Sequence, residues 1–174
     1  MPPLPPICVA LDCPIRQSIN SLLNSLDPSR CWLKVGPIVF NAYGPQIIAD
    51  IRAHGFDVFL DLKFHDIPNT VASAVEFAAS MGVKMLTVHA AGGKKMLQAA
   101  VCAARQSQQK PHIVAVTALT SLTDPDLQDI GCNVAVAGLV QLRAKLAIDS
   151  GCSGVVASPL ELVDLRQLYP KTLL

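Results

Sequence analysis

The feature that most constrains the fold is a regular series of short apolar runs separated by longer, helix-like stretches. Six runs have the length and composition of β-strands: Ile7–Leu11, Cys31–Val35, Asp57–Leu62, Met85–His89, His112–Thr117 and Gly154–Ala157. The first four intervals between their starts are 24, 26, 28 and 27 residues, and the next two, ending at a seventh run from Thr172, are 42 and 18. Near-equal intervals of one strand plus one helix predict repeated βα units and a parallel sheet.

Two architectures are built from serial βα units, an open doubly wound sheet and a closed (β/α)8 barrel. The doubly wound fold usually carries a glycine-rich phosphate loop after its first strand. Here Asp12–Arg16 follows the first run and contains no glycine, and the chain has no G-x-G-x-x-G motif. We therefore expect an α/β fold of the TIM-type (β/α)8 class. Eight units need about 210 residues, so 174 residues predict an incomplete barrel of about six units plus the start of strand seven.

Helix start signals lie between the later runs. Asp124, followed by proline, predicts an N-cap, and Ser158–Glu161 has the form of a capping box. The long fifth interval has room for an extra helix near Asp124–Ile130 before a main helix at Val134–Ser150.

Domain organisation and hydropathy indicate one globular unit. No low-complexity linker divides the chain, so we expect one barrel domain over residues 7–174, preceded by a short disordered lead over residues 1–6. Hydrophobic residues make up 51% of the chain, yet no apolar stretch approaches the about 20 residues of a membrane helix. One candidate, Val134–Ile148, is interrupted by Arg143 and Lys145. We therefore expect no membrane partner.

Charge and cysteine content exclude further classes of function. Lys plus Arg number 14 and Asp plus Glu number 13, which gives a net charge of +1. The chain therefore lacks the excess of basic residues that is typical of proteins that bind nucleic acid. The six cysteines form no C-x-x-C pair and no metal-ligand spacing, and several lie in apolar runs, where we expect small buried hydrophobic side chains. These patterns predict a reduced, cytoplasmic protein without a metal site or a nucleic-acid partner.

Charged residues stand at the carboxyl ends of the first three apolar runs. These residues are Asp12, Lys34, Asp61 and Lys63. Catalytic groups of a barrel lie at this end of the strands, and ionised groups in apolar surroundings are costly unless paired. We therefore expect these aspartates and lysines to form a network of alternating charge in one mouth of the barrel. Structural ion pairs are the competing interpretation, but four charges on three consecutive strands favour function.

The predicted network suits a limited range of chemistry. A lysine held among carboxylates stays protonated and can donate a proton from a defined position. A carboxylate beside it repels an anionic group of a substrate. Such a site favours loss of that group and protonation of the carbanion left behind, as in cofactor-free decarboxylation. Aldol and isomerase chemistry are also compatible with these residues.

The segment Asp61–Thr70, DLKFHDIPNT, closely resembles the signature of the orotidine 5′-phosphate decarboxylase family. Three further stretches agree with the family in order and spacing: Val9–Asp12, Leu33–Gly36 and Val116–Ser121. Val88–Ala90 and Gly154–Ser158 also resemble the bacterial form of the family. The resemblance implies a (β/α)8 barrel and a homodimer. It also implies a lyase of pyrimidine biosynthesis that converts orotidine 5′-monophosphate to uridine 5′-monophosphate and carbon dioxide, the last step of UMP biosynthesis, without a cofactor.

The resemblance also implies roles for individual residues in the reaction. It makes Lys63 the proton donor to the pyrimidine carbon that loses its carboxylate, and it places Asp61 against that carboxylate. Lys34 and Asp66 complete the Lys–Asp network, with Asp66 reaching in from the partner subunit.

Further residues are implied to bind the nucleotide. Asp12 and Lys34 would hold the ribose hydroxyls, and Thr120 would contact the pyrimidine. Ile67 and Thr70 would contact the ligand across the dimer interface. His65, inside the signature, is interpreted as ordering its loop rather than as an acid or base.

The sequence departs from the family at its end. Family members continue past the seventh strand into a loop with a glycine and an arginine and then an eighth strand, which carry phosphate contacts, whereas this sequence ends at Tyr169–Leu174. We therefore expect a truncated product or fragment. Two alternatives to the decarboxylase remain open: a related, magnesium-dependent sugar-phosphate decarboxylase or aldolase on the same barrel, and a non-catalytic remnant that only dimerises or binds nucleotide.

Overall fold

The computed structural model describes residues 7–174, so the disordered lead expected over residues 1–6 lies outside the described residues. Six parallel strands form one sheet in which each strand pairs with the next along the chain. The strands are β1 (Ile7–Leu11), β2 (Cys31–Val35), β3 (Val58–Phe64), β4 (Met85–His89), β5 (His112–Val116) and β6 (Gly154–Val156). The predicted parallel sheet is therefore confirmed.

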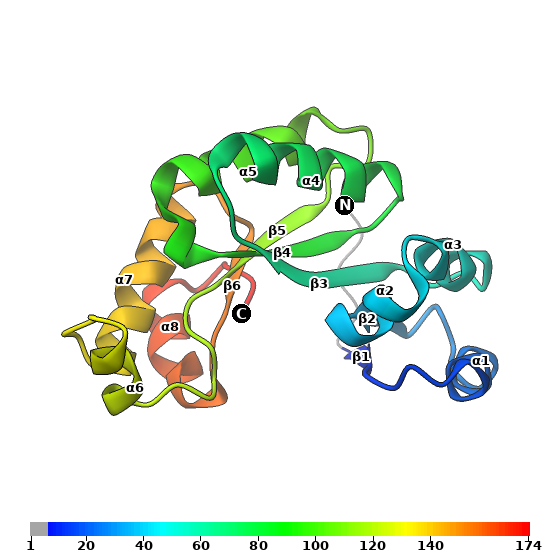
Figure 1. Ribbon diagram of the computed structural model, residues 1–174, viewed down its shortest axis with the longest axis horizontal. Coiled ribbons are helices and arrows are strands. Elements are labelled where there is room, and N and C mark those ends of the chain that lie inside the picture. Colours follow the sequence, from blue (N-terminus) through cyan, green and yellow to red (C-terminus); the bar gives the residue numbers. More distant parts are fainter. Residues whose placement is uncertain (1–6) are drawn as a thin grey trace.

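Each connection between consecutive strands contains at least one α-helix. The helices are α1 (Arg16–Ser25), α2 (Pro37–Tyr43), α3 (Gln46–Ala53), α4 (Pro68–Ser80), α5 (Gly93–Gln106), α6 (Asp124–Asp129), α7 (Val136–Asp149) and α8 (Leu162–Leu168), with 3-10 turns η1 (Ala90–Gly92) and η2 (Pro159–Glu161). Helices α1 to α3 lie at the β1 end of the curved sheet, α4 and α5 cover its middle, and α6 to α8 lie at the β6 end (Figure 1). Six βα units in sequential order confirm the incomplete TIM-type barrel.

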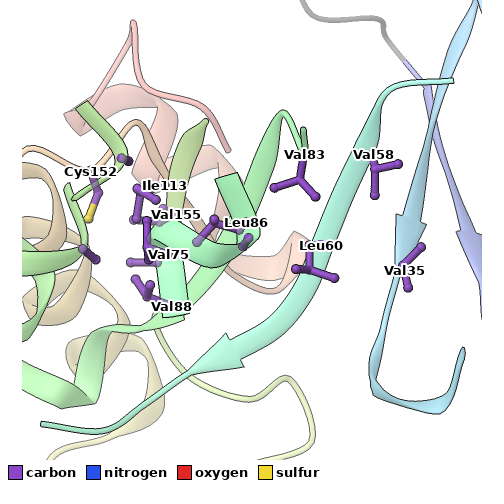
Figure 2. Close-up of a cluster of buried hydrophobic side chains, with 14 of the residues drawn as sticks. Val35, Val58, Leu60, Val75, Val83, Leu86, Val88, Ile113, Cys152 and Val155 are labelled. Atoms are coloured by element: carbon purple, nitrogen blue, oxygen red, sulfur yellow. The ribbon is translucent and has the colours of Figure 1, made fainter. Parts of the chain in front are cut away.

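The core lies between the sheet and its covering helices, because alternate strand residues point to opposite faces. Leu60 of β3 and Leu86 of β4 are almost fully buried, as is Val75 of α4. Figure 2 shows this part of the core, with Leu60 and Leu86 from neighbouring strands. Cys31 and Cys152 belong to the same buried cluster, as expected. The expectation does not extend to the other cysteines, of which Cys8, Cys13 and Cys102 are exposed and Cys132 is partly exposed.

The far edge of the sheet differs in detail from the prediction. In place of a seventh strand from Thr172, a single parallel bridge joins Gly154 to Leu173. The Val155 amide donates to the Leu173 carbonyl at 3.0 Å, and the Leu173 amide donates to the Ser153 carbonyl at 3.3 Å. The chain thus adds to the sheet at the predicted place and in the predicted direction, over one residue pair.

The start of α6 also differs from the prediction. The N-cap is Thr123 rather than Asp124, and the Thr123 amide donates to Asp126 Oδ2 at 2.7 Å. Asp124 instead accepts a hydrogen bond from the Val136 amide at 2.7 Å. Because Val136 is the first residue of α7, this carboxylate satisfies one of the free amides at that helix start and ties α6 to α7.

Candidate active site

The carboxyl end of β3 is irregular. β3 pairs with β4 through Phe59–Met85 and Leu60–Leu86, and pairing resumes only at Phe64–Val88. Between these pairs β3 advances four residues while β4 advances two. The extra length forms a bulge, a device that re-aims side chains next to functional sites. It also explains why β3 continues to Phe64, two residues beyond the predicted end.

Lys63 lies in this bulge with an uncommon backbone conformation. Its φ angle is 51°, in the left-handed region that residues with a Cβ seldom adopt. Such a conformation persists only where the surroundings hold it, and it is often found at functional sites. The Lys63 amide donates to Thr87 Oγ1 of β4 at 2.8 Å, and the Lys63 ammonium lies 2.9 Å from Asp61 Oδ1.

Asp61 is the centre of the network. It is 9% exposed, and its two oxygens have different partners. Oδ1 accepts from Lys63 Nζ and, at 3.0 Å, from the Thr87 hydroxyl, whereas Oδ2 lies 3.4 Å from Lys34 Nζ. Lys34 Nζ in turn lies 3.7 Å from Oδ1 of the largely exposed Asp12. The structure therefore brings together Asp12, Lys34, Asp61 and Lys63 from three adjacent strands, as the sequence predicted.

The electrostatics of the site keep the central carboxyl group ionised. Burial acts to raise the pKa of Asp61. The hydrogen bond and charge of Lys63, the hydrogen bond from Thr87 and the charge of Lys34 act in the opposite direction. The pKa of Asp61 lies below its ordinary value as a result. A fixed negative charge thus lies between two lysines at the mouth of the barrel.

The other signature residues lie outside this network in the single chain. Asp66, Ile67 and Thr70 are exposed on the β3–α4 loop and the start of α4. The Asp66 carboxylate accepts from the Ile67 amide at 2.6 Å, and no ion pair within residues 7–174 includes Asp66. Ile67 is 67% exposed, a large apolar side chain open to solvent.

Thr120 lies in the loop between β5 and α6. It lines a pocket of about 380 Å³ whose walls come from this loop, from α7 and from Ser158 and its neighbours after β6. Both loops follow the carboxyl ends of strands, the edge of the sheet on which the Lys–Asp network also lies.

Two histidines pack beside the network. The rings of His65 and His89 stack with their centroids 5.2 Å apart. Burial lowers the pKa of His89, and the neighbouring His65, Arg143 and Lys63 lower it further. We expected His65 to order the loop that follows β3. Its stacking on His89 is a structural contact of the kind that this role requires.

Thr87 is a member of the network that was not among the residues predicted from the sequence. This threonine is the one polar residue in the middle of the apolar run Met85–His89, and it is almost completely buried. The sequence did contain a signal for it, because a hydroxyl group at the centre of a buried strand needs hydrogen-bond partners. Its partners on β3 are not visible in the sequence, since they depend on the bulge.

Within residues 7–174, no group of three or more His, Cys, Asp or Glu side chains is arranged to hold a metal ion. Over the same range, none of the helices combines the length and apolar character needed to cross a membrane.

Comparisons with known proteins identify the family to which the chain belongs. A model of one protein family matches residues 5–173 of the chain. The chain belongs to the orotidine 5′-phosphate decarboxylase / HUMPS family. The chain is 49% identical over 164 residues to an orotidine 5′-phosphate decarboxylase of Saccharophagus degradans, covering 94% of this chain and 69% of the relative. A protein of the same name from Alcanivorax borkumensis is 47% identical, with 93% and 70% coverage.

Solved structures of the orotidine 5′-phosphate decarboxylase / HUMPS family agree with the fold described above. The orotidine 5′-phosphate decarboxylase of Lactobacillus acidophilus matches with a TM-score of 0.86 and 37% identity, over 94% of this chain and 75% of that chain. An orotidine 5′-monophosphate decarboxylase of Methanocaldococcus jannaschii, complexed with the inhibitor BMP, matches with a TM-score of 0.77 over 97% and 75%. At 19% identity, the second match supports the fold alone.

Proposed function

We propose that this site removes the carboxylate of orotidine 5′-monophosphate as carbon dioxide and yields uridine 5′-monophosphate, without a cofactor. The observation that carries the proposal is the contact of 2.9 Å between Lys63 Nζ and Asp61 Oδ1, within a network that also contains Lys34 and Asp12. Membership of the family, with relatives of this name at 47% and 49% identity, supports the same reaction.

In the proposed reaction, the bond between the pyrimidine ring and its carboxylate breaks, and its electron pair stays on the ring carbon. Lys63 donates a proton from Nζ to that carbon, and carbon dioxide leaves. Asp61 faces the departing carboxylate. Because Lys63, Lys34 and Thr87 favour the ionised form of Asp61, the negative charge persists when a second anion is placed beside it. The repulsion falls as the substrate carboxylate loses its charge, which favours the transition state over the bound substrate.

The remaining residues of the proposed site bind the nucleotide. Asp12 and Lys34 contact the ribose hydroxyls, and Thr120 contacts the pyrimidine from the pocket after β5. Their places at or just after the carboxyl ends of β1, β2 and β5 support this assignment, since ligands of such barrels bind at this end.

The proposed enzyme is a homodimer in which Asp66, Ile67 and Thr70 complete the partner's site. The exposure of all three residues supports this assignment. The exposed Asp66 carboxylate, which makes no ion pair within residues 7–174, and the Ile67 side chain, which is 67% exposed, are available to a second subunit. The proposed compartment is the cytoplasm, whose reducing conditions suit the six free cysteines.

The test is turnover of orotidine 5′-monophosphate by the purified chain, with Lys63→Ala as the variant and exposed Lys95→Ala as its matched control. The proposal expects product from the wild type and from Lys95→Ala, and a loss of kcat of more than about 10³-fold in Lys63→Ala. Binding of a uridine monophosphate analogue without turnover would support the non-catalytic remnant instead. Turnover of a sugar phosphate that stops on addition of a chelator would support the magnesium-dependent alternative.

A further inference from the structure

Thr87 is a polar residue at a buried position of the sheet. It lies in the middle of β4, is 1% exposed, and has apolar neighbours in Leu86 and Val88. A hydroxyl group taken out of water costs free energy unless it finds hydrogen-bond partners. In Thr87 both partners belong to the bulge of β3, and both are residues of the Lys–Asp network.

The two hydrogen bonds of Thr87 have opposite directions. Its Oγ1 accepts from the backbone amide of Lys63 at 2.8 Å and donates to Asp61 Oδ1 at 3.0 Å. A threonine hydroxyl has one proton and two lone pairs, so this pattern uses its donor and one acceptor. The single proton is donated to Asp61 Oδ1, and this hydrogen bond favours the ionised form of the carboxyl group.

The contact with the Lys63 amide replaces a bond of the regular ladder. Pairing between β3 and β4 is interrupted from Leu60 to Phe64, and Lys63 turns into the left-handed region within this gap. A partly buried amide without a hydrogen-bond partner would oppose that conformation. The Thr87 side chain supplies the acceptor, so one hydroxyl stabilises both the backbone turn of Lys63 and the orientation of the Asp61 carboxylate.

We propose that Thr87 is a positioning residue that holds Asp61 and Lys63 in the geometry needed for proton transfer. The inference rests on the proposed function, since it deepens the account of the same site. Thr87 itself acts through its two partners. Its hydroxyl, rather than its shape, carries the effect.

The first test separates the hydroxyl from the shape by kinetics. Thr87→Val keeps the volume and removes the hydroxyl, whereas Thr87→Ser keeps the hydroxyl. Thr117→Val is the matched control, because Thr117 is also fully buried but donates to the Val156 carbonyl at 2.9 Å. We expect kcat to fall about 10- to 100-fold in Thr87→Val, since hydrogen bonds to charged groups carry the larger energies, with KM within about threefold.

The controls make the kinetic result decisive. Thr87→Ser should keep kcat within about threefold, and Thr117→Val should keep kcat even though its thermal midpoint falls like that of Thr87→Val. An unchanged kcat in Thr87→Val would overturn the proposal. An equal loss of kcat in Thr117→Val would also overturn it, because the effect would then be a general loss of packing.

A second test does not depend on turnover. Carbon-13 NMR of aspartate side chains, with Asp61→Asn to assign the signal, measures the titration of Asp61 in each variant. Loss of the Thr87 hydrogen bond should raise the pKa of Asp61 in Thr87→Val and leave it unchanged in Thr87→Ser and Thr117→Val. Absence of turnover in the wild type would count against the proposed function, whereas an unchanged Asp61 titration would overturn the positioning role.

Discussion

The ammonium of Lys63 lies 2.9 Å from Oδ1 of Asp61, and the two residues meet across a bulge rather than along a regular strand. Regular alternation would also place residues i and i+2 on one face. Here the left-handed turn at Lys63 brings the amine to the carboxylate, and Thr87 fixes the turn from the neighbouring strand. The catalytic pair of the proposed reaction thus depends on a backbone conformation as well as on two side chains.

The backbone of Lys63 leads to a first prediction, about stability. Lys63→Ala and Lys63→Gly both remove the ammonium, but only glycine adopts a φ of 51° without a Cβ penalty. We expect the glycine variant to have a free energy of unfolding about 1 kcal/mol higher than the alanine variant. Urea denaturation of the two proteins measures the difference. An alanine variant as stable as the glycine variant would contradict the left-handed conformation.

Much of the fold could be predicted from the sequence, because strand starts follow from local hydrophobic patterns. The predicted starts of β2, β4, β5 and β6 are those observed, and the charged residues at strand ends converge as expected. The bulge could not be predicted, because it depends on a hydrogen bond between Lys63 and Thr87, 24 residues apart. The N-cap of α6 was assigned one residue late, since Asp124 bonds to α7 instead.

A second prediction concerns the proposed dimer. Ile67 and Ile130 are both 67% exposed, but only Ile67 belongs to the surface that is proposed to meet a second subunit. A charge buried without a partner in an interface is strongly unfavourable. Ile67→Glu should therefore raise the dissociation constant of the dimer at least about tenfold, while Ile130→Glu should leave it unchanged.

Sedimentation velocity over a range of protein concentrations measures both dissociation constants. A wild-type chain that is monomeric at every concentration would contradict the homodimer. Equal weakening by Ile67→Glu and Ile130→Glu would show that the effect is not specific to the proposed interface.

A third prediction tests the edge of the sheet after β6. A Cβ added to Gly154 would lie closer to the Leu173 carbonyl group than van der Waals contact allows. Gly154→Ala should therefore break the bridge to Leu173 and release the Val155 amide, which donates to the Leu173 carbonyl at 3.0 Å. Hydrogen exchange should be faster at Val155 in the variant. Unchanged protection of this amide would mean that the bridge does not hold the chain end in place.

The last prediction is a pH dependence of stability that comes from His89. Burial, together with His65, Arg143 and Lys63, lowers the pKa of His89 from its ordinary value of 6.5. Below pH 6.5 the unfolded chain therefore binds more protons than the folded protein, and the free energy of unfolding decreases as the pH falls. Burial lowers the pKa of His112 as well, so this residue contributes a loss of stability in the same direction.

Replacement of His89 by asparagine isolates its share of this dependence. The asparagine oxygen can still accept the hydrogen bond that His89 Nδ1 receives from the Ala91 amide at 3.3 Å, but it does not titrate. Between pH 7 and pH 5, His89→Asn should therefore lose less stability than the wild type, and the double variant with His112→Asn should lose less still. Urea denaturation at the two pH values measures each loss. A loss of stability in His89→Asn equal to that of the wild type would contradict this prediction. It would mean that His89 has the same pKa in the folded protein as in the unfolded chain.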